Sequence, residues 1–150
     1  MVDIHLPAIA DKSKTIEVTD RISAKAIRGS WVGIIDPIVV SQRNTGIFSA
    51  LDLVINLEQG EQGKTVERFQ AILQEHRDKL THADGLIAIG GGSTINMATA
   101  LAAEMARANA ALAYDIVPTT LLAMVDVAYG SLGLLNKDGL YGVIVANKWM

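Results

Sequence analysis

Three short segments of the chain carry residue types that bind phosphates and hydroxyl groups. They are GEQGKT at residues 60–65, GGGS at residues 90–93 and PTT at residues 118–120. Each one directly follows a run of residues that is typical of a β-strand. In sheets of parallel strands, ligands bind beyond the carboxyl ends of the strands. We therefore expect the three segments to lie near one another at one edge of a sheet.

The glycine segment has the composition of a phosphate-binding turn. Gly90, Gly91 and Gly92 let the backbone approach a ligand, and Ser93 is expected to be the N-cap of the helix that follows. A helix N-terminus offers free N–H groups and a partial positive charge, so a diphosphate is the expected occupant. The spacing is not that of the common G-x-G-x-x-G fingerprint. The alternative is a tight turn that needs positive φ angles.

The other two segments offer side chains to a ligand. The Glu61 carboxylate could accept both hydroxyls of a ribose, while the Lys64 ammonium could pair with phosphate or fix that carboxylate. The alternative for this pair is a solvated helix start. Thr119 and Thr120 place two hydroxyls at a strand end, where either could also cap a helix. Asp126 follows in an apolar helix and needs a partner, which could be a ligand hydroxyl, a basic side chain or solvent.

Alternating strands and helices must position these segments. We expect strands at residues 15–19, 31–35, 53–57, 86–89 and 111–117, with helices at residues 65–80, 93–108 and 120–127. Residues 132–136 and 141–145 flank Lys137-Asp138-Gly139, which predicts a late β-hairpin with Asp-Gly at its turn. This order predicts an α/β fold, a doubly wound, mostly parallel, Rossmann-like sheet that is covered on both faces. A chain of 150 residues is expected to form a single domain.

Composition excludes several classes of function. The net charge is −3 and no Lys/Arg cluster forms a basic face, so we expect no nucleic-acid partner. Charged residues and Pro118 interrupt the most apolar stretch, residues 97–124, so no membrane span is expected. His5, His76 and His82 do not have metal-ligand spacing. The first residues do not look like a signal peptide, and a cytoplasmic location is the default expectation.

Taken together, the segments resemble a known enzyme family. G-E-x-x-K-T, then G-G-G with a polar residue four positions later, then V-P-T-T-L-L-A-x-V-D at residues 117–126 resemble 3-dehydroquinate synthase and related sugar-phosphate cyclases. The resemblance covers roughly residues 30–146. It implies an amino-terminal domain that binds NAD, in an enzyme whose carboxyl-terminal helical domain binds a divalent metal such as zinc or cobalt. That helical domain is absent from these 150 residues.

The resemblance also implies roles for individual residues. Glu61 and Lys64 would contact the adenosine side of NAD, and Thr119 and Thr120 the nicotinamide ribose. The glycine turn, Gly90, Gly91, Gly92 and Ser93, would hold the diphosphate. Asn96 stands where the family usually has an Asp near the cofactor, and Asp126 would face substrate hydroxyls as the candidate catalytic residue.

Other positions depart from the family pattern. Leu132 stands where the family has a lysine that binds substrate, and residues 140–142 (LYG) replace the family's G-K-N, which removes a second lysine. Each lost charge-assisted contact corresponds to about 1.5–3 kcal/mol. The usual substrate, a small phosphorylated sugar acid or related polyol, should therefore bind poorly.

Three functions follow as hypotheses. The first is the NAD-binding domain of a diverged 3-dehydroquinate synthase-like lyase, inactive alone. The second is the NAD domain of an iron-dependent alcohol or polyol dehydrogenase, and the third is a non-catalytic interaction module. Whether the chain is an enzyme is left open. The apolar surface of such a domain predicts a homo-oligomer, or pairing with the missing helical domain.

Overall fold

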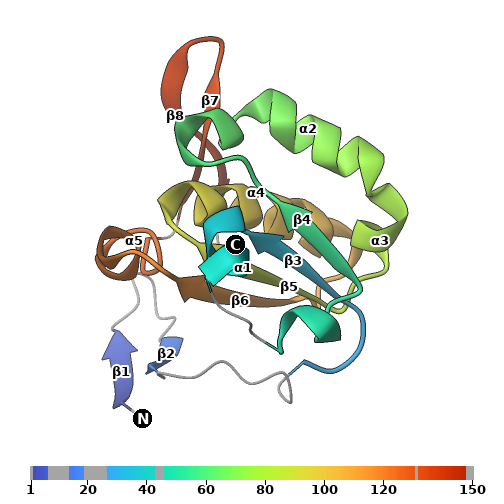
Figure 1. Ribbon diagram of the computed structural model, residues 1–150, viewed down its shortest axis with the longest axis vertical. Helices are drawn as coiled ribbons and strands as arrows, with labels where there is room; N and C mark the ends of the chain where they lie inside the picture. The colour runs from blue at the N-terminus through green and yellow to red at the C-terminus, as the bar shows by residue number, and fades with distance from the viewer. Residues whose placement is uncertain (1, 7–13, 19–26, 43–45, 131, 148–150) are drawn as a thin grey trace.

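The computed structural model describes residues 2–6, 14–18, 27–42, 46–130 and 132–147. Its centre is a sheet of four parallel strands (Figure 1). In spatial order these are β4 (Leu53–Asn56), β3 (Trp31–Ile35), β5 (Gly85–Gly90) and β6 (Ala113–Pro118). The predicted α/β fold with a parallel sheet is confirmed, and four of the predicted strands form this sheet.

Helices and short turns connect these strands. After β3 come α1 (Pro37–Gln42) and the 3₁₀ turn η2 (Phe48–Ala50), and after β4 come η3 (Gly60–Gly63), α2 (Val66–Glu75) and α3 (Arg77–Thr81). The longest helix, α4 (Gly92–Ala108), joins β5 to β6, and α5 (Leu121–Val125) follows β6. Each strand end at the carboxyl edge thus leads directly into a loop or helix start.

The strands alternate their side chains between two apolar cores, which is why both faces of the sheet must be covered. Val32 and Ile34 of β3 pack in the core beneath α2, α3 and α4, and Leu86 and Ala88 of β5 do the same. The intervening residues point to the other face, where a second core lies beneath the α1 and η2 segment. Its buried members are Trp31, Ile35, Ile47, Ile87 and Ile89.

The predicted late hairpin is also confirmed. Strands β7 (Leu132–Lys137) and β8 (Leu140–Asn147) pair antiparallel, and their turn places Asp138 at φ 50° and Gly139 at φ 78°. Two successive positive φ angles define the type I′ turn that the Asp-Gly pair favours. The hairpin packs against α4 and projects beyond the sheet (Figure 1).

Some predicted elements differ from the structure. The strand expected at residues 15–19 is β2 (Lys14–Val18). It is not part of the four-stranded sheet and pairs antiparallel with β1 (Val2–Leu6) in a sheet of two strands. Residue 19 lies outside the described residues. The single helix expected at residues 65–80 is divided at His76, whose φ of −116° and ψ of 19° leave the α region. A continuous apolar stripe does not reveal such a break.

Candidate functional site

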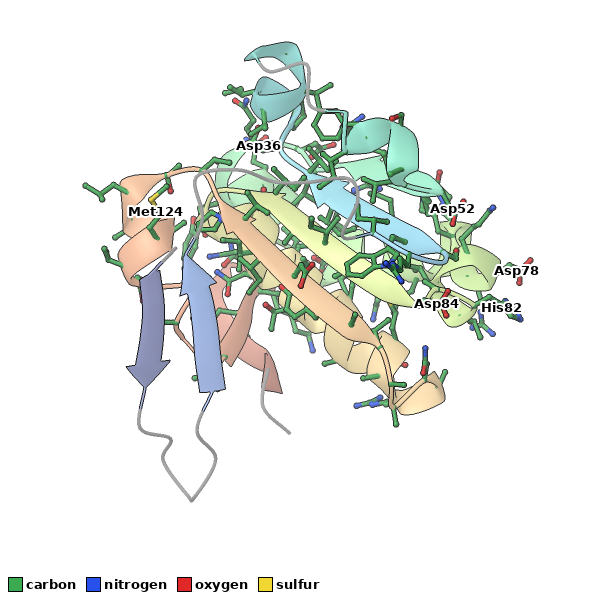
Figure 2. All side chains as sticks on the ribbon, turned by 90° about the horizontal axis from the view of Figure 1, so that it is seen from below. Asp36, Asp52, Asp78, His82, Asp84 and Met124 are labelled. Carbon is green, nitrogen blue, oxygen red and sulfur yellow. The ribbon has the colours of Figure 1, made fainter. Side chains whose placement is uncertain are left out.

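The three predicted segments leave the same edge of the sheet. Residues 60–65 follow β4, the glycine turn follows β5 and Thr119 follows β6. Gly90 and Pro118 are paired at the ends of their strands, and the Thr119 N–H donates to the Gly90 carbonyl at 2.9 Å. Figure 2 shows Asp36 and Met124 at this carboxyl edge and Asp52 and Asp84 at the opposite end. The glycine turn and the Pro-Thr-Thr segment are therefore direct neighbours.

Gly90, Gly91 and Gly92 matter because they lack a side chain, and not because they adopt unusual backbone angles. None of the three has a positive φ, so the alternative of a positive-φ turn is excluded. A Cβ on Gly90 would lie 2.6 Å from Thr94 Oγ1, which packing forbids. A Cβ on Gly91 or Gly92 would lie 3.4 Å from a methyl group of Thr120 or Val127, an ordinary contact. At Gly91 and Gly92 the fold itself therefore tolerates a side chain, and its absence leaves the turn open to a ligand.

The helix after this turn begins earlier than expected. Gly91 is the N-cap of α4, so the prediction that Ser93 caps the helix is wrong. The first bond across the helix start runs from Ile95 N to Gly91 O at 3.1 Å. By α-helix geometry, the N–H groups of Gly92, Ser93 and Thr94 precede that bond and have no carbonyl partner within the helix. Ser93 instead directs its hydroxyl toward Glu61.

Glu61 is the centre of a polar cluster that joins segments distant in sequence. Its Oε2 accepts from Asn136 Nδ2 at 2.9 Å and lies 3.1 Å from Lys64 Nζ, while Ser93 Oγ lies 3.5 Å from Oε1. Glu61 follows β4 and Ser93 follows β5, with β3 between these two strands in the sheet. The loop after β4 thus reaches across the end of β3 to the start of α4.

These partners favour the ionised form of Glu61. The hydrogen bond from Asn136 and then that from Lys64 hold the pKa of the Glu61 carboxyl below its ordinary value, against a smaller opposing effect of burial. The Lys64 side chain is only 12% exposed, whereas that of Glu61 is 54% exposed. The pair is therefore not a fully solvated helix start: the ammonium is largely enclosed, and the carboxylate faces the open edge of the sheet.

Asn136 is a residue of this cluster that the sequence did not single out. Its backbone N–H donates to Lys64 O at 2.8 Å, and its Oδ1 accepts from Gly142 N at 3.1 Å. It is 9% exposed and forms an isolated parallel bridge with Thr65. Its place before the Asp-Gly turn indicated only a hairpin strand, because its partner Glu61 is 75 positions away.

Asp36 also lies at this edge without having been considered for a site. The sequence indicated only that Asp36-Pro37 ends a strand. Its Oδ1 accepts from Ile38 N at 3.0 Å, as a cap of α1, and lies 3.5 Å from Gln59 Nε2. Its N–H donates to Ile89 O at 2.9 Å, which places it between the ends of β3 and β5.

Asn96 has an architectural role in the structure. It is 6% exposed, its Oδ1 accepts from Leu134 N at 2.9 Å and its Nδ2 donates to Gly92 O at 3.0 Å. The side chain therefore fastens β7 to the first turn of α4. An amide makes both bonds, whereas an ionised Asp could accept the first but not donate the second. A contact between Asn96 and a cofactor stays a prediction.

The threonines and Asp126 complete the edge. Thr120 is the N-cap of α5, and its Oγ1 accepts from Ala123 N at 3.2 Å. This confirms the prediction that one of the two threonines could cap a helix. Thr119 is exposed beside it. Asp126 does not lie within the helix but ends it, and its side chain is exposed, so solvent can serve as its partner.

The described part of the chain provides little for a metal ion. It contains no group of three or more His, Cys, Asp or Glu side chains that could hold one.

No helix within the described ranges has the length and apolarity to cross a membrane.

Comparison with known proteins assigns the family. Residues 54–144 match the model of the 3-dehydroquinate synthase N-terminal family, and the chain belongs to that family. It is 33% identical over 89 residues to 3-dehydroquinate synthase of Chlamydia pneumoniae, and 38% identical over 84 residues to that of Enterococcus faecalis (strain ATCC 47077 / OG1RF). The alignments cover 59% and 55% of this chain but only 23% of each relative.

Solved structures support the fold. A 2-deoxy-scyllo-inosose synthase, crystallised with carbaglucose-6-phosphate, NAD⁺ and Co²⁺, superposes with a TM-score of 0.73 at 22% identity. The match covers 97% of this chain and 42% of that one. A probable glycerol dehydrogenase from Sinorhizobium meliloti shares the fold with a TM-score of 0.57 at 16% identity, over 79% of this chain and 30% of that one. The predicted family is confirmed, and the dehydrogenase alternative has only the shared fold in its favour.

Proposed function

We propose that this chain is the NAD-binding domain of a diverged 3-dehydroquinate synthase-like cyclase, inactive without a helical metal-binding domain. The observation that carries the proposal is the meeting of Glu61 and Ser93 at the carboxyl edge, next to the glycine turn. It brings an ionised carboxylate and a helix N-terminus together from two different loops. Family membership and the NAD⁺ in the similar cyclase structure agree with this assignment.

The side chains and N–H groups at the carboxyl edge of the sheet each bind a different part of NAD. The Glu61 carboxylate accepts hydroxyls of the adenosine ribose, and Lys64 holds that carboxylate in place. The N–H groups at the start of α4, with Gly91 and Gly92 free of side chains, receive the diphosphate. Thr119 donates to the nicotinamide ribose, while the Thr120 hydroxyl keeps its proton available because its oxygen accepts from Ala123 N.

The chemistry proposed for the whole enzyme uses NAD transiently. When bound, the nicotinamide would take a hydride from a substrate carbon that bears a hydroxyl and later return it. Asp126, exposed just after α5, would accept a hydrogen bond from a substrate hydroxyl. A zinc or cobalt ion would belong to the second domain, since the described residues offer no ligand set for it.

The proposed substrate is a polyol or sugar-derived acid with less need of cationic partners than the usual one. Leu132 and Tyr141 are exposed but carry no positive charge, so neither position supplies one to a phosphate or carboxylate. A non-catalytic module that keeps the fold is the alternative, and it predicts that substitution of Gly91 or Thr119 leaves biological activity intact.

Calorimetric titration of the chain with NAD tests the proposal. We expect saturable binding that is lost when Gly91 is replaced by Val, because a branched side chain would occupy the turn. Gly46→Val serves as the control, since no atom of the described residues lies within 4 Å of the position that its Cβ would take. The absence of any heat at millimolar NAD would refute the cofactor assignment.

A further inference from the structure

Asn136 connects three segments through nearly all of its hydrogen-bonding groups. Its side-chain amide donates to Glu61 Oε2 at 2.9 Å and to the Glu61 carbonyl at 3.3 Å. Its side-chain oxygen accepts from Gly142 N at 3.1 Å, and its backbone N–H donates to Lys64 O at 2.8 Å. One residue of β7 thus holds the η3 loop at both Glu61 and Lys64, and holds β8 as well.

We infer that Asn136 is a positioning residue for the nucleotide ribose, acting through Glu61. This inference rests on the proposed function and adds to it a residue that does not itself touch the ligand. An unsupported Glu side chain on an exposed loop samples many rotamers, and each must be given up on binding. Asn136 removes that cost in advance, because Oε2 is occupied by Asn136 and Lys64 while Oε1 is left toward Ser93 and the open edge.

Burial of Asn136 favours its hydrogen bond to Glu61 over a bond to water. Asn136 is 9% exposed, so its amide has little access to water and is satisfied by Glu61 itself. Among the described residues, Lys64 is the one cationic side chain within 4 Å of the Glu61 carboxylate. Lys64 provides a positive charge from the same loop as Glu61, whereas Asn136, in the hairpin, orients the Glu61 carboxylate. The hairpin and the ribose contact are therefore coupled, and displacement of β7 should weaken nucleotide binding.

Two ligands that differ at the ribose separate this role from a general structural one. We compare ADP with 2′-deoxy-ADP by calorimetry in the unaltered chain and in Asn136→Leu, which keeps the branching at Cγ and the number of side-chain heavy atoms but removes the amide. The unaltered chain should prefer ADP about tenfold, as expected for a hydrogen bond to a charged group. Asn136→Leu should bring the two affinities within about twofold by weakening ADP alone. Equal weakening of both ligands would overturn the inference.

A second variant and a ligand-free measurement guard against loss of folding. Asn136→Asp keeps the acceptor for Gly142 N but places a carboxyl group against Glu61, so the two should titrate as a pair with one pKa raised. NMR titration without nucleotide should show a higher pKa of the Glu61 carboxyl in Asn136→Leu, and a raised pKa for one carboxyl of the coupled pair in Asn136→Asp. An unchanged pKa of Glu61 in folded Asn136→Leu would also overturn the inference.

The matched control is Asn109→Leu. Asn109 likewise bridges two segments with its amide, to Ala83 O at 3.2 Å and from Ala111 N at 3.0 Å, but at the opposite end of the sheet. It should leave the ADP preference unchanged. If the unaltered chain binds neither nucleotide, the proposed function fails together with the ribose role. If it binds ADP and Asn136→Leu retains the preference, only the role of Asn136 fails.

Discussion

The side-chain amide of Asn136 lies 2.9 Å from the carboxylate of Glu61, although 75 positions separate the two residues. The contact joins the late hairpin to the loop after β4. It gives the Glu61 carboxylate a partner outside its own loop, and it makes the candidate ribose contact depend on two parts of the fold.

Replacement of Glu61 by Gln should weaken NAD binding. The neutral amide keeps the size of the side chain but loses the charge that strengthens hydrogen bonds to ribose hydroxyls, at about 1.5–3 kcal/mol. Calorimetric titration measures the change. Glu67→Gln is the matched control, since Glu67 is an exposed carboxylate in the first turn of α2. Equal affinities of Glu61→Gln and the unaltered chain would contradict the role.

The lowered pKa of Glu61 predicts how stability depends on pH. A carboxyl whose pKa is lower in the folded than in the unfolded chain contributes stability that is present above the unfolded value. That contribution is lost as the pH falls through the folded value. Urea unfolding should therefore separate the unaltered chain from Glu61→Gln at neutral pH, and the difference should shrink below the ordinary value of 4.5. A difference that grows with acidification would show that the sign is wrong.

Asn96→Asp should destabilise this chain even though it introduces the residue usual in the family. The carboxylate can accept from Leu134 N but faces the Gly92 carbonyl without a proton to donate. Leaving such a buried group unsatisfied costs about 1–3 kcal/mol. Chemical denaturation gives the free energy of unfolding, with the exposed Asn56→Asp as control. Unchanged stability at neutral pH would indicate that the hairpin adjusts.

Gly90→Ala should lower stability, whereas Gly91→Ala should weaken NAD binding. At Gly90 the added methyl would lie 2.6 Å from Thr94 Oγ1, so we expect overpacking that costs about 1–3 kcal/mol. Thr94→Ala should relieve part of this loss. At Gly91 the methyl makes only an ordinary contact with Thr120, so stability should change little while NAD binding weakens. Thermal unfolding and calorimetry separate the two outcomes.

The outer face of α5 should promote self-association. Leu121 is 77%, Leu122 70% and Val125 66% exposed, which is unusual for neighbouring apolar residues on a soluble surface. Light scattering should show the unaltered chain associating as its concentration rises. The double variant Leu121→Glu/Val125→Glu should remain monomeric. Ile38→Glu, an exposed apolar position on α1, should not prevent association. A monomeric unaltered chain at high concentration would refute this prediction.

Much of the fold is predictable from local patterns. The run WVGII at residues 31–35 and the apolar residues 86–89 are short and apolar, as is typical of buried strands, and they form β3 and β5. The Asp138-Gly139 turn was also predictable from local sequence, because few residue pairs accept two positive φ angles. The places of Glu61, Gly91 and Thr119 at strand ends likewise follow from the order of the elements.

The tertiary structure decided what these residues touch. The position of Asn96 in its motif does not reveal that the side chain fastens β7 to α4, because Leu134 N lies within its reach only in the folded chain. The sequence around Asn136 indicated a hairpin strand but not its contact with Glu61, since the parallel sheet and the hairpin bring the two residues together. Sequence by itself determined the order of the elements, the turns and the glycine segment, all of which depend on neighbouring residues. Only tertiary packing set the orientation of Glu61 and lowered the pKa of its carboxyl further, because Asn136 and Ser93 reach it from distant segments, whereas Lys64 is in its own loop.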